Sequence, residues 1–481
     1  MGTQELDQER TAGLSPRRWL VLIAMTGSLS MVMLDQTVVA VALPSMTRDL
    51  PLSAHGGAWV ANAYVLAMAA LVALGGRAGD LLGGRTTFRV GVTLFFLASA
   101  GCAFAPTGDA GQGVLIAFRA LQGVGAALMV PVSAAIVMAE FPPAERGRVM
   151  AMYAGISQIF LALGPLIGGL LTEYVSWRAV FLLNVPVGIA TLVLVRIARV
   201  PNVRRPAGRL SVLDIVLVVG GLGLTTVAVQ QSGLWGWASP VTLTLLTAGV
   251  LATAVFVVRQ LRSRDPLMQL RLFADRGFTG DAVVMALVQF GLLGMVLYSS
   301  VYLQGVLGIS PAQAGVAVLP LIIPLTVAAQ IGGRWFDRAG VRAPALTGLL
   351  VCAAGAVLWT LALPTLTYGW QIPGMVVMGL GLGLTLSPTN TDALARAGED
   401  RRSQASGVVQ TMRQLGGTLG VAVIGSVVVS RVHSSGLSDG SPHTTADAIS
   451  AGFLCAAVAF ALAAAAAAVF LQRRPLVTDQ G

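Results

Sequence analysis

Long apolar runs alternate with short polar connections from one end of this chain to the other. Each run is long enough for a helix to cross the hydrocarbon core of a bilayer, and arginine, glycine and proline mark most of the connections. The pattern predicts an all-α integral membrane protein with fourteen transmembrane helices. Their ranges are 19–43, 57–74, 87–105, 112–139, 150–171, 179–200, 212–232, 239–259, 278–303, 312–333, 343–363, 370–388, 404–430 and 448–471.

Composition supports this class of protein. Hydrophobic residues make up 55% of the 481 residues and charged residues only 11%, whereas a soluble domain carries about 25% charged residues. The net charge of +10 does not indicate a nucleic-acid partner, because the arginines cluster in alternate connections rather than along one face. The predicted surroundings are a lipid bilayer.

The distribution of arginine predicts the orientation in the membrane. Fifteen arginines lie in alternate connections, and five more lie near the chain ends, whereas the other connections and their edges hold only Arg48, Arg178 and Arg431. Positive connections stay on the cytoplasmic side. We therefore expect a multi-pass protein of the cell (plasma or inner) membrane, with cytoplasmic tails at 1–18 and 472–481.

A weak internal repeat indicates two halves. GRAGDLLGGR (76–85) and GRWFDRAGVR (333–342) both place a glycine four residues before an aspartate and another three residues after it. Parallel halves of this kind are typical of transporters. We expect a six-helix bundle at 19–200, a linker with two additional helices at 201–277 and a second six-helix bundle at 278–471, in a monomer.

Enzymes that need a metal, a cofactor or ATP are not indicated. Cys102, Cys352 and Cys455 lie far apart inside apolar runs, and no histidine stands at ligand spacing from another. The chain contains no GxxxxGK[ST] phosphate-binding string. We expect no enzymatic activity and no cofactor.

The most informative residue is Asp35, an acid inside the first apolar run. A charge at that depth costs about 2.5–3.5 kcal/mol on insertion scales, and residues that carry this cost usually face an ion or substrate path. No basic residue lies within helical reach in its own run, so burial is expected to favour the neutral acid near pH 7. The alternative is a structural hydrogen bond to a neighbouring helix.

Two intramembrane arginines accompany it. Arg119 stays charged and therefore needs carbonyls, water or an acid partner. Gln122 lies one helical turn away, where it could share that network, and it is also a candidate for lining the transport pathway. A static clamp between helices is the alternative role. Arg413 and Gln414 lie in a glycine-rich run and are candidates for lining the transport pathway.

Other candidate residues belong to four groups. A conformational latch is predicted near the first turn of the third helix and in its repeat, a helix bend or a packing contact in the fifth run, and pathway lining or simple packing for three aromatic residues. Asp214, Asp281 and Asp392 lie near run ends, where solvated or capping roles are expected. The residues of the first three groups are Gly76, Asp80, Gly83, Arg85, Asp337 and Arg338; Gly164, Pro165, Gly168 and Gly169; and Tyr64, Phe290 and Tyr298.

Six strings in order resemble the major facilitator superfamily, specifically its fourteen-helix drug:proton antiporters. They are LDQTVVAVALP (34–44), GRAGDLLGGR (76–85), RALQGVGAA (119–127), GPLIGG (164–169), WRAVFLLNVP (177–186) and YLQGVLGISPAQAGVAVLP (302–320). The sequence departs from the family pattern at Ala40, Leu81 and Phe160. The resemblance implies two six-helix bundles plus two extra central helices, and proton exchange between Asp35 and Arg119.

These observations lead to one expected function. The chain is expected to be a proton-coupled antiporter that exports hydrophobic or cationic amphipathic small molecules, such as antibiotics or biocides, by alternating access. Protons are the coupling ion, and neither ATP nor nucleic acid takes part. The alternatives are an uptake symporter for a small metabolite, or a membrane protein that does not transport, such as a sensor or a membrane enzyme.

Overall fold

The computed structural model describes residues 16–50, 56–108, 110–204, 211–263, 266–397, 402–434 and 441–472. All the regular elements in these ranges are helices. Thirteen helices there are long and apolar enough to cross a membrane, and a helix pair bent by 40° between Gly155–Leu161 and Leu163–Tyr174 would be a fourteenth. The predicted all-α membrane fold is confirmed. The tails predicted at 1–18 and 472–481 lie almost entirely outside the described residues.

The first half is assembled through glycines that let helix backbones touch. A Cβ atom on Gly75 of α3 would overlap the carbonyl oxygen of Ala127 in α5, and one on Gly125 of α5 would lie 2.7 Å from the amide nitrogen of Phe95 in α4. Such close approach is a common way to pack membrane helices. The helices are α2 (Pro16–Asp49), α3 (Gly56–Leu82), α4 (Gly84–Ala103), α5 (Ala110–Glu140), α6 (Pro143–Tyr174), α7 (Trp177–Leu182) and α8 (Asn184–Ile197).

The second half is packed in the same manner. A Cβ atom on Gly355 of α14 would overlap the backbone of Met378 in α15, and one on Gly383 of α15 would overlap the carbonyl of Leu325 in α13. The helices are α11 (Arg276–Gly305), α12 (Pro311–Ala317), α13 (Leu319–Ala339), α14 (Arg342–Ala362), α15 (Tyr368–Arg396), α16 (Arg402–Ser434) and α17 (Pro442–Phe470), with short 3-10 turns η1 (Leu270–Ala274) and η2 (Leu363–Thr365).

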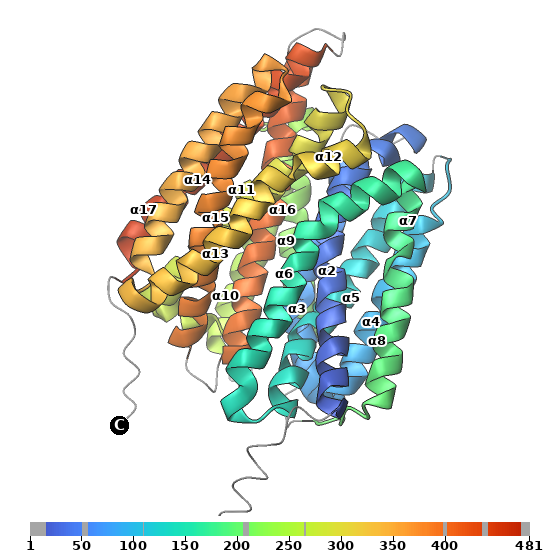
Figure 1. Cartoon of the computed structure of the whole chain (residues 1–481), viewed down its shortest axis with the longest axis vertical. Coiled ribbons are helices and arrows are strands. Elements are labelled where there is room, and N and C mark those ends of the chain that lie inside the picture. Colours follow the sequence, from blue (N-terminus) through green and yellow to red (C-terminus); the bar gives the residue numbers. More distant parts are fainter. Residues whose placement is uncertain are drawn as a thin grey trace, which may run out of the picture.

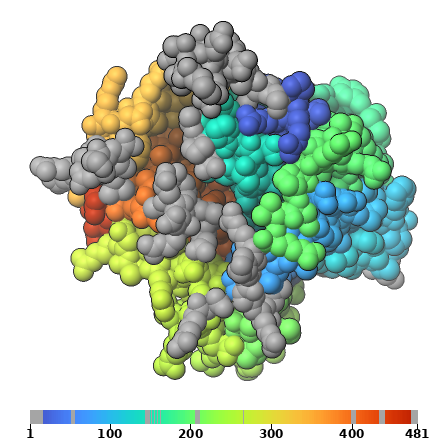
Figure 2. All heavy atoms as spheres, turned by 90° about the horizontal axis from the view of Figure 1, so that it is seen from below, coloured from blue at the N-terminus to red at the C-terminus, as the bar shows by residue number. Residues whose placement is uncertain are grey.

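Two further helices, α9 (Val212–Trp235) and α10 (Pro240–Arg262), connect the halves. They pack on each other through Gly221 and Gly249, and α9 contacts both α3 and α16. The hydroxyls of Ser232 in α9 and Ser426 in α16 lie 2.8 Å apart. Figure 2 shows the helices α9 and α10 at one edge of the molecule, beside both halves. The boundaries at 200 and 278 between bundles and linker stay a prediction.

The first and last described helices orient the bundle. The helix α2 begins, and α17 ends, toward the lower end of Figure 1. We call this end the tail side and the other end the opposite side. The α3–α4 turn and the segment after α8 lie on the tail side, where Arg17 Nε donates to the carbonyl of Ala198 (2.9 Å). The α11–α12 connection lies on the opposite side.

Candidate functional site

Asp35 and Arg119 form a buried ion pair between α2 and α5. Arg119 Nη1 lies 2.6 Å from Asp35 Oδ2, and the two residues are 1% and 0% exposed. The expectation for Asp35 took account only of residues in its own run; in the structure α5 supplies a counter-charge, Arg119. Buried charges persist when they are paired in this way, and removing one partner leaves the other uncompensated.

Amide and hydroxyl groups complete the surroundings of this pair. Gln122 Nε2 donates to Asp35 Oδ1 (2.9 Å), and its Oε1 accepts from Arg119 (2.7 Å). Asn184 Nδ2 lies 3.5 Å from Asp35 Oδ1 and donates to Ser99 Oγ (3.0 Å). We call Asp35, Arg119, Gln122, Ser99 and Asn184 the polar cluster. It ties α2, α4, α5 and α8 together inside the first half.

Arg119 is also held by groups that would remain if Asp35 became neutral. Its Nε donates to the carbonyl of Val60 (2.9 Å), and its Cζ lies 4.4 Å from the centre of the Tyr64 ring. A cation over an aromatic face is stabilised electrostatically. Tyr64 and Gln122 were predicted to line a pathway. In this conformation both are fully buried in or against the polar cluster.

Sequence reasoning missed two members of the polar cluster, Ser99 and Asn184. Asn184 was within reach, because it is the one amide in the apolar stretch of WRAVFLLNVP. Ser99 could not be singled out from the sequence, because a single serine in an apolar helix is common and its hydroxyl usually donates to a backbone carbonyl of the same helix. Here its hydroxyl donates to the carbonyl of Phe181 (2.8 Å) and accepts from Asn184.

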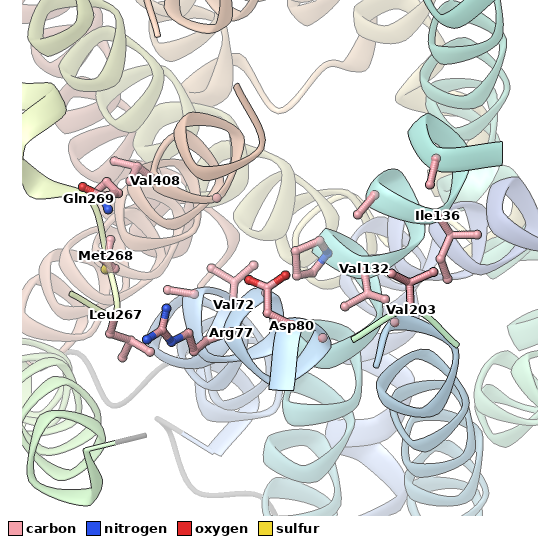
Figure 3. Close-up of a pocket in the computed structure, with 18 of the residues that line it drawn as sticks. Val72, Arg77, Asp80, Val132, Ile136, Val203, Leu267, Met268, Gln269 and Val408 are labelled. Carbon is pink, nitrogen blue, oxygen red and sulfur yellow. The ribbon is translucent and has the colours of Figure 1, made fainter. Parts of the chain in front are cut away.

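A cavity of about 330 Å³ lies at the tail side, lined by α3, α5, α16 and the segments 200–203 and 266–269. Figure 3 shows Asp80 and Arg77 beside apolar side chains such as Val132 and Met268. The sequence placed Asp80 near the first turn of the third helix. That expectation is wrong, because α3 continues to Leu82, so Asp80 lies near a helix C-terminus.

Gly83 and Arg85 of the predicted latch dock within the first half. Gly83 has φ +94°, and a Cβ there would overlap the Asn202 side chain, whose Oδ1 accepts from the amide of Thr86 (3.1 Å). Arg85 Nη1 donates to the carbonyl of Val200 (3.2 Å). The repeat residues Asp337 and Arg338 are exposed near the end of α13, whereas Gly76 lines the cavity. The latch role stays a prediction.

On the opposite side the two halves contact each other directly. Gln304 Nε2 of α11 donates to the carbonyl of Val41 in α2 (2.7 Å). The amide of Ala312, in the first turn of α12, donates to the Glu173 carboxylate of α6 (2.8 Å). An acid at a helix N-terminus also interacts favourably with the helix dipole. This contact closes the opposite side while the cavity occupies the tail side.

The GPLIGG string forms the centre of that contact. Cβ atoms on Gly164 and Gly168 would overlap Thr37 and approach Val38 of α2, and one on Gly169 would overlap the carbonyl of Pro311. The carbonyl of Pro165 in turn occupies the space of a Cβ on Gly315. The glycines therefore pack α6 between α2 and α12. The 40° bend precedes Gly164 directly, and a moving hinge there stays a prediction.

We expect Gly169→Ala to open the opposite side. The added methyl overlaps the Pro311 carbonyl, so the population shifts toward conformations in which α6 and α12 separate. The measurement is the pulsed-EPR distance between spin labels at Tyr174 and Val316, both exposed, which should lengthen. Gly155→Ala on the same helix has open space around it and should leave the distance unchanged. An unchanged distance in Gly169→Ala contradicts this role.

The remaining pathway candidates lie in the second half. Gln414 is buried and its Nε2 lies 3.0 Å from Met68 Sδ, which links α16 to α3. Arg413 is partly buried, and its Nε has no hydrogen-bond partner among the described residues. Phe290 and Tyr298 are partly buried and pack against Gly420 and Gly425 of α16. Whether any of the four lines the transport pathway stays a prediction.

Comparison with known proteins gives the family. The model of the Major Facilitator Superfamily matches residues 25–421. The chain therefore belongs to the Major Facilitator Superfamily and is a multi-pass membrane transporter, as its helices and internal arrangement indicate. Family and fold point away from an enzyme.

Curated relatives cover most of the chain. It is 36% identical over 425 residues to the tetracenomycin C resistance and export protein of Streptomyces glaucescens, and the aligned region covers 88% of this chain and 78% of that protein. It is 37% identical over 458 residues to the puromycin resistance protein of Streptomyces alboniger, spanning 94% and 90%.

Solved structures support the fold alone, because their identity is low. A D-xylose-proton symporter superposes with a TM-score of 0.65 at 18% identity, covering 94% of this chain and 97% of that one. A bacterial homologue of the human lysosomal transporter Spinster, inward-facing and unoccupied, gives 0.63 at 18% identity, covering 96% and 99%. Both support the predicted major facilitator fold.

Proposed function

We propose that this protein exports amphipathic small molecules, such as antibiotics or biocides, in exchange for protons across the cell membrane. The observation that carries the proposal is the buried Asp35–Arg119 pair. A protonatable acid held against a fixed cation in a membrane interior can link proton uptake to a change of conformation. Relatives named for resistance to and export of antibiotics support the direction.

The orientation follows from the arginine distribution. With the tail side in the cytoplasm, the cavity between α3, α5 and α16 faces inward, and the contact between α6 and α12 closes the outside. The described conformation is then the inward-facing one. Asp35 lies fourteen residues from the opposite-side end of α2 and nineteen from its tail-side end, about 21 and 29 Å at the α-helical rise. It is therefore closer to the outside, the source of protons.

Protonation of Asp35 would rearrange the polar cluster. The neutral acid loses its ionic attraction to Arg119, which retains the Val60 carbonyl, Gln122 and the Tyr64 ring as partners. The α2–α5 contact weakens while α5 stays intact, so the angle between these helices is free to change. Each proton that moves inward contributes about 2.3 kcal/mol per 100 mV of membrane potential.

The cavity lining fits amphipathic and cationic substrates. Apolar side chains, among them Val72, Val132 and Met268, share it with Asp80 and with Glu140, whose carboxylate is paired with Arg17 (3.2 Å). Apolar surface with a few placed charges is the usual composition of a small-molecule site. A hydrophobic molecule with an amine group would satisfy both parts, and Arg77 at the same cavity would limit how many positive charges it carries.

The direction of flux tests the proposal. In inside-out vesicles that contain the protein, an acid interior should drive uptake of a lipophilic fluorescent cation, since the vesicle interior corresponds to the cell exterior. Collapsing the pH gradient should release it. Proton-driven movement of the cation out of these vesicles would instead indicate an uptake symporter. A D-xylose-proton symporter has a similar fold.

A further inference from the structure

Three carboxyl groups in the second half converge on one arginine. Arg396, in the last turn of α15, lies 2.5 Å from Asp392 Oδ2, 3.8 Å from Asp281 Oδ2 and 3.4 Å from Asp275 Oδ1. The side chain of Asp275 is half exposed and caps α11 at the amide of Phe278. Those of Asp281 and Asp392 are 0% and 4% exposed. The expectation of solvated or capping roles for these two acids is therefore wrong.

The site is shaped to hold the guanidinium. A Cβ on Gly277, at the start of α11, would overlap Cζ and Nη1 of Arg396, so the glycine leaves the space that the cation fills. Arg396 is thereby held between α11 and α15, and its side chain is only 3% exposed. Among the described residues, the buried charged groups in this pocket are two acids and one base.

Charge balance requires one more positive charge in this pocket. Asp281 and Asp392 together carry two negative charges when ionised, and Arg396 neutralises one. Two carboxylates this close in a buried site cannot both stay ionised at low cost, because each disfavours ionisation of the other. Asp392 has the shorter contact with Arg396, so the guanidinium counters the charge of Asp392 more strongly than that of Asp281.

Hydrogen bonding leads to the same conclusion independently. As a carboxylate, Asp281 has no donor for either oxygen among the described residues, although it is fully buried. Asp281 Oδ2 and Asp392 Oδ2 lie 3.8 and 2.5 Å from the same Arg396 Nε, so the two carboxyl groups are neighbours. Two carboxylates only accept hydrogen bonds, so this contact needs a proton between them. A protonated Asp281 donates to Asp392 and resolves both the missing partner and the excess charge.

We propose that Asp281 and Asp392 bind a single shared proton, which makes this pocket a second protonation site, separate from Asp35. The other charged groups that act on Asp281 are Arg396 and Asp275; α17 presents the apolar Phe470 and Leu471 at neighbouring Gly280. Loss of the proton leaves a buried negative charge between α11 and α15 and pushes them apart at the tail side. The proposal does not depend on the exported substrate or on Asp35.

Infrared spectroscopy of the full chain in lipid tests it. With isotope-labelled aspartate at neutral pH, without substrate or gradient, the protein should show the carbonyl band of a protonated aspartate. Asp281→Asn should lose one such acid, because the introduced amide can itself donate to Asp392. Asp392→Asn should lose it as well, because Asp281 then faces Arg396 alone and ionises.

A matched control distinguishes loss of the shared proton from a general effect of removing a buried acid. Asp214 in α9 has its own arginine, with Arg259 Nε 2.6 Å from its Oδ1, so Asp214→Asn should leave the band intact. The proposal is overturned if folded Asp281→Asn protein keeps the full band or if the wild-type chain shows none. Should Asp281→Asn fail to fold, retention of the full band in Asp392→Asn overturns it instead.

Discussion

Asp35→Asn is expected to abolish proton-driven export and to leave insertion in the membrane unchanged. The amide cannot take up a proton in this range of pH, so the step that links proton entry to the conformational change disappears. Asparagine has nearly the same shape as aspartate and can keep the hydrogen-bond geometry with Gln122. Transport in inside-out vesicles driven by a pH gradient should fall to the level of vesicles without the protein.

The control for this experiment is an acid of the same type outside the polar cluster. Asp447 on α17 is exposed, and Asp447→Asn should transport like the wild-type chain. Binding of substrate to purified Asp35→Asn protein should persist, which separates lost coupling from lost binding. Gradient-driven export that survives in Asp35→Asn at equal protein levels refutes the role of Asp35.

The second large effect is on stability. Arg119→Gln leaves Asp35 buried without its cation, and breaking one partner of a buried ion pair typically costs about 3–5 kcal/mol. The free energy of unfolding in detergent should drop by about that amount. The double variant Asp35→Asn with Arg119→Gln should recover much of the loss, because it leaves no uncompensated charge.

A double-mutant cycle measures this coupling. Arg119→Lys is the informative intermediate, since it keeps the charge but loses the planar fork that reaches Asp35, Gln122 and the Val60 carbonyl together. It should fall between wild type and Arg119→Gln in stability. Additive effects of the two single changes would show that the pair is not coupled in the folded protein.

Much of the fold could be predicted from hydrophobic pattern alone. A bilayer offers no hydrogen bonds to the backbone, so each apolar run has to form a helix, and run length predicted nearly all of the spans. The ends of the helices differ from the ends of the predicted runs. The helix α3 extends through Asp80 to Leu82, because glycines and the two charges of Arg77 and Asp80 do not stop a helix that packs through Gly75 and Gly79 against α5.

The candidate site was predicted in part. Asp35 and Arg119 are visible as charges in apolar runs, but their pairing at 2.6 Å depends on how α2 and α5 cross. For the same reason, the sequence did not predict the pocket around Arg396. Asp281 and Asp392 lie 111 positions apart in the chain, and their positions near run ends favoured solvated roles. Burial by a facing helix cannot be read from either run alone.

The sequence by itself determined the class of protein: a chain of apolar runs with alternating positive connections has to span a membrane, and its ordered strings define the family. Only the tertiary structure decided which charges meet. Hydrophobicity acts locally along each helix and is written in the order of residues, whereas ion pairs and shared protons depend on the crossing and rotation of helices. The crossing and rotation of the helices are determined by close contacts of glycines, such as that between Gly169 and Pro311 and that between Gly277 and Arg396. No single segment of the sequence reveals these contacts.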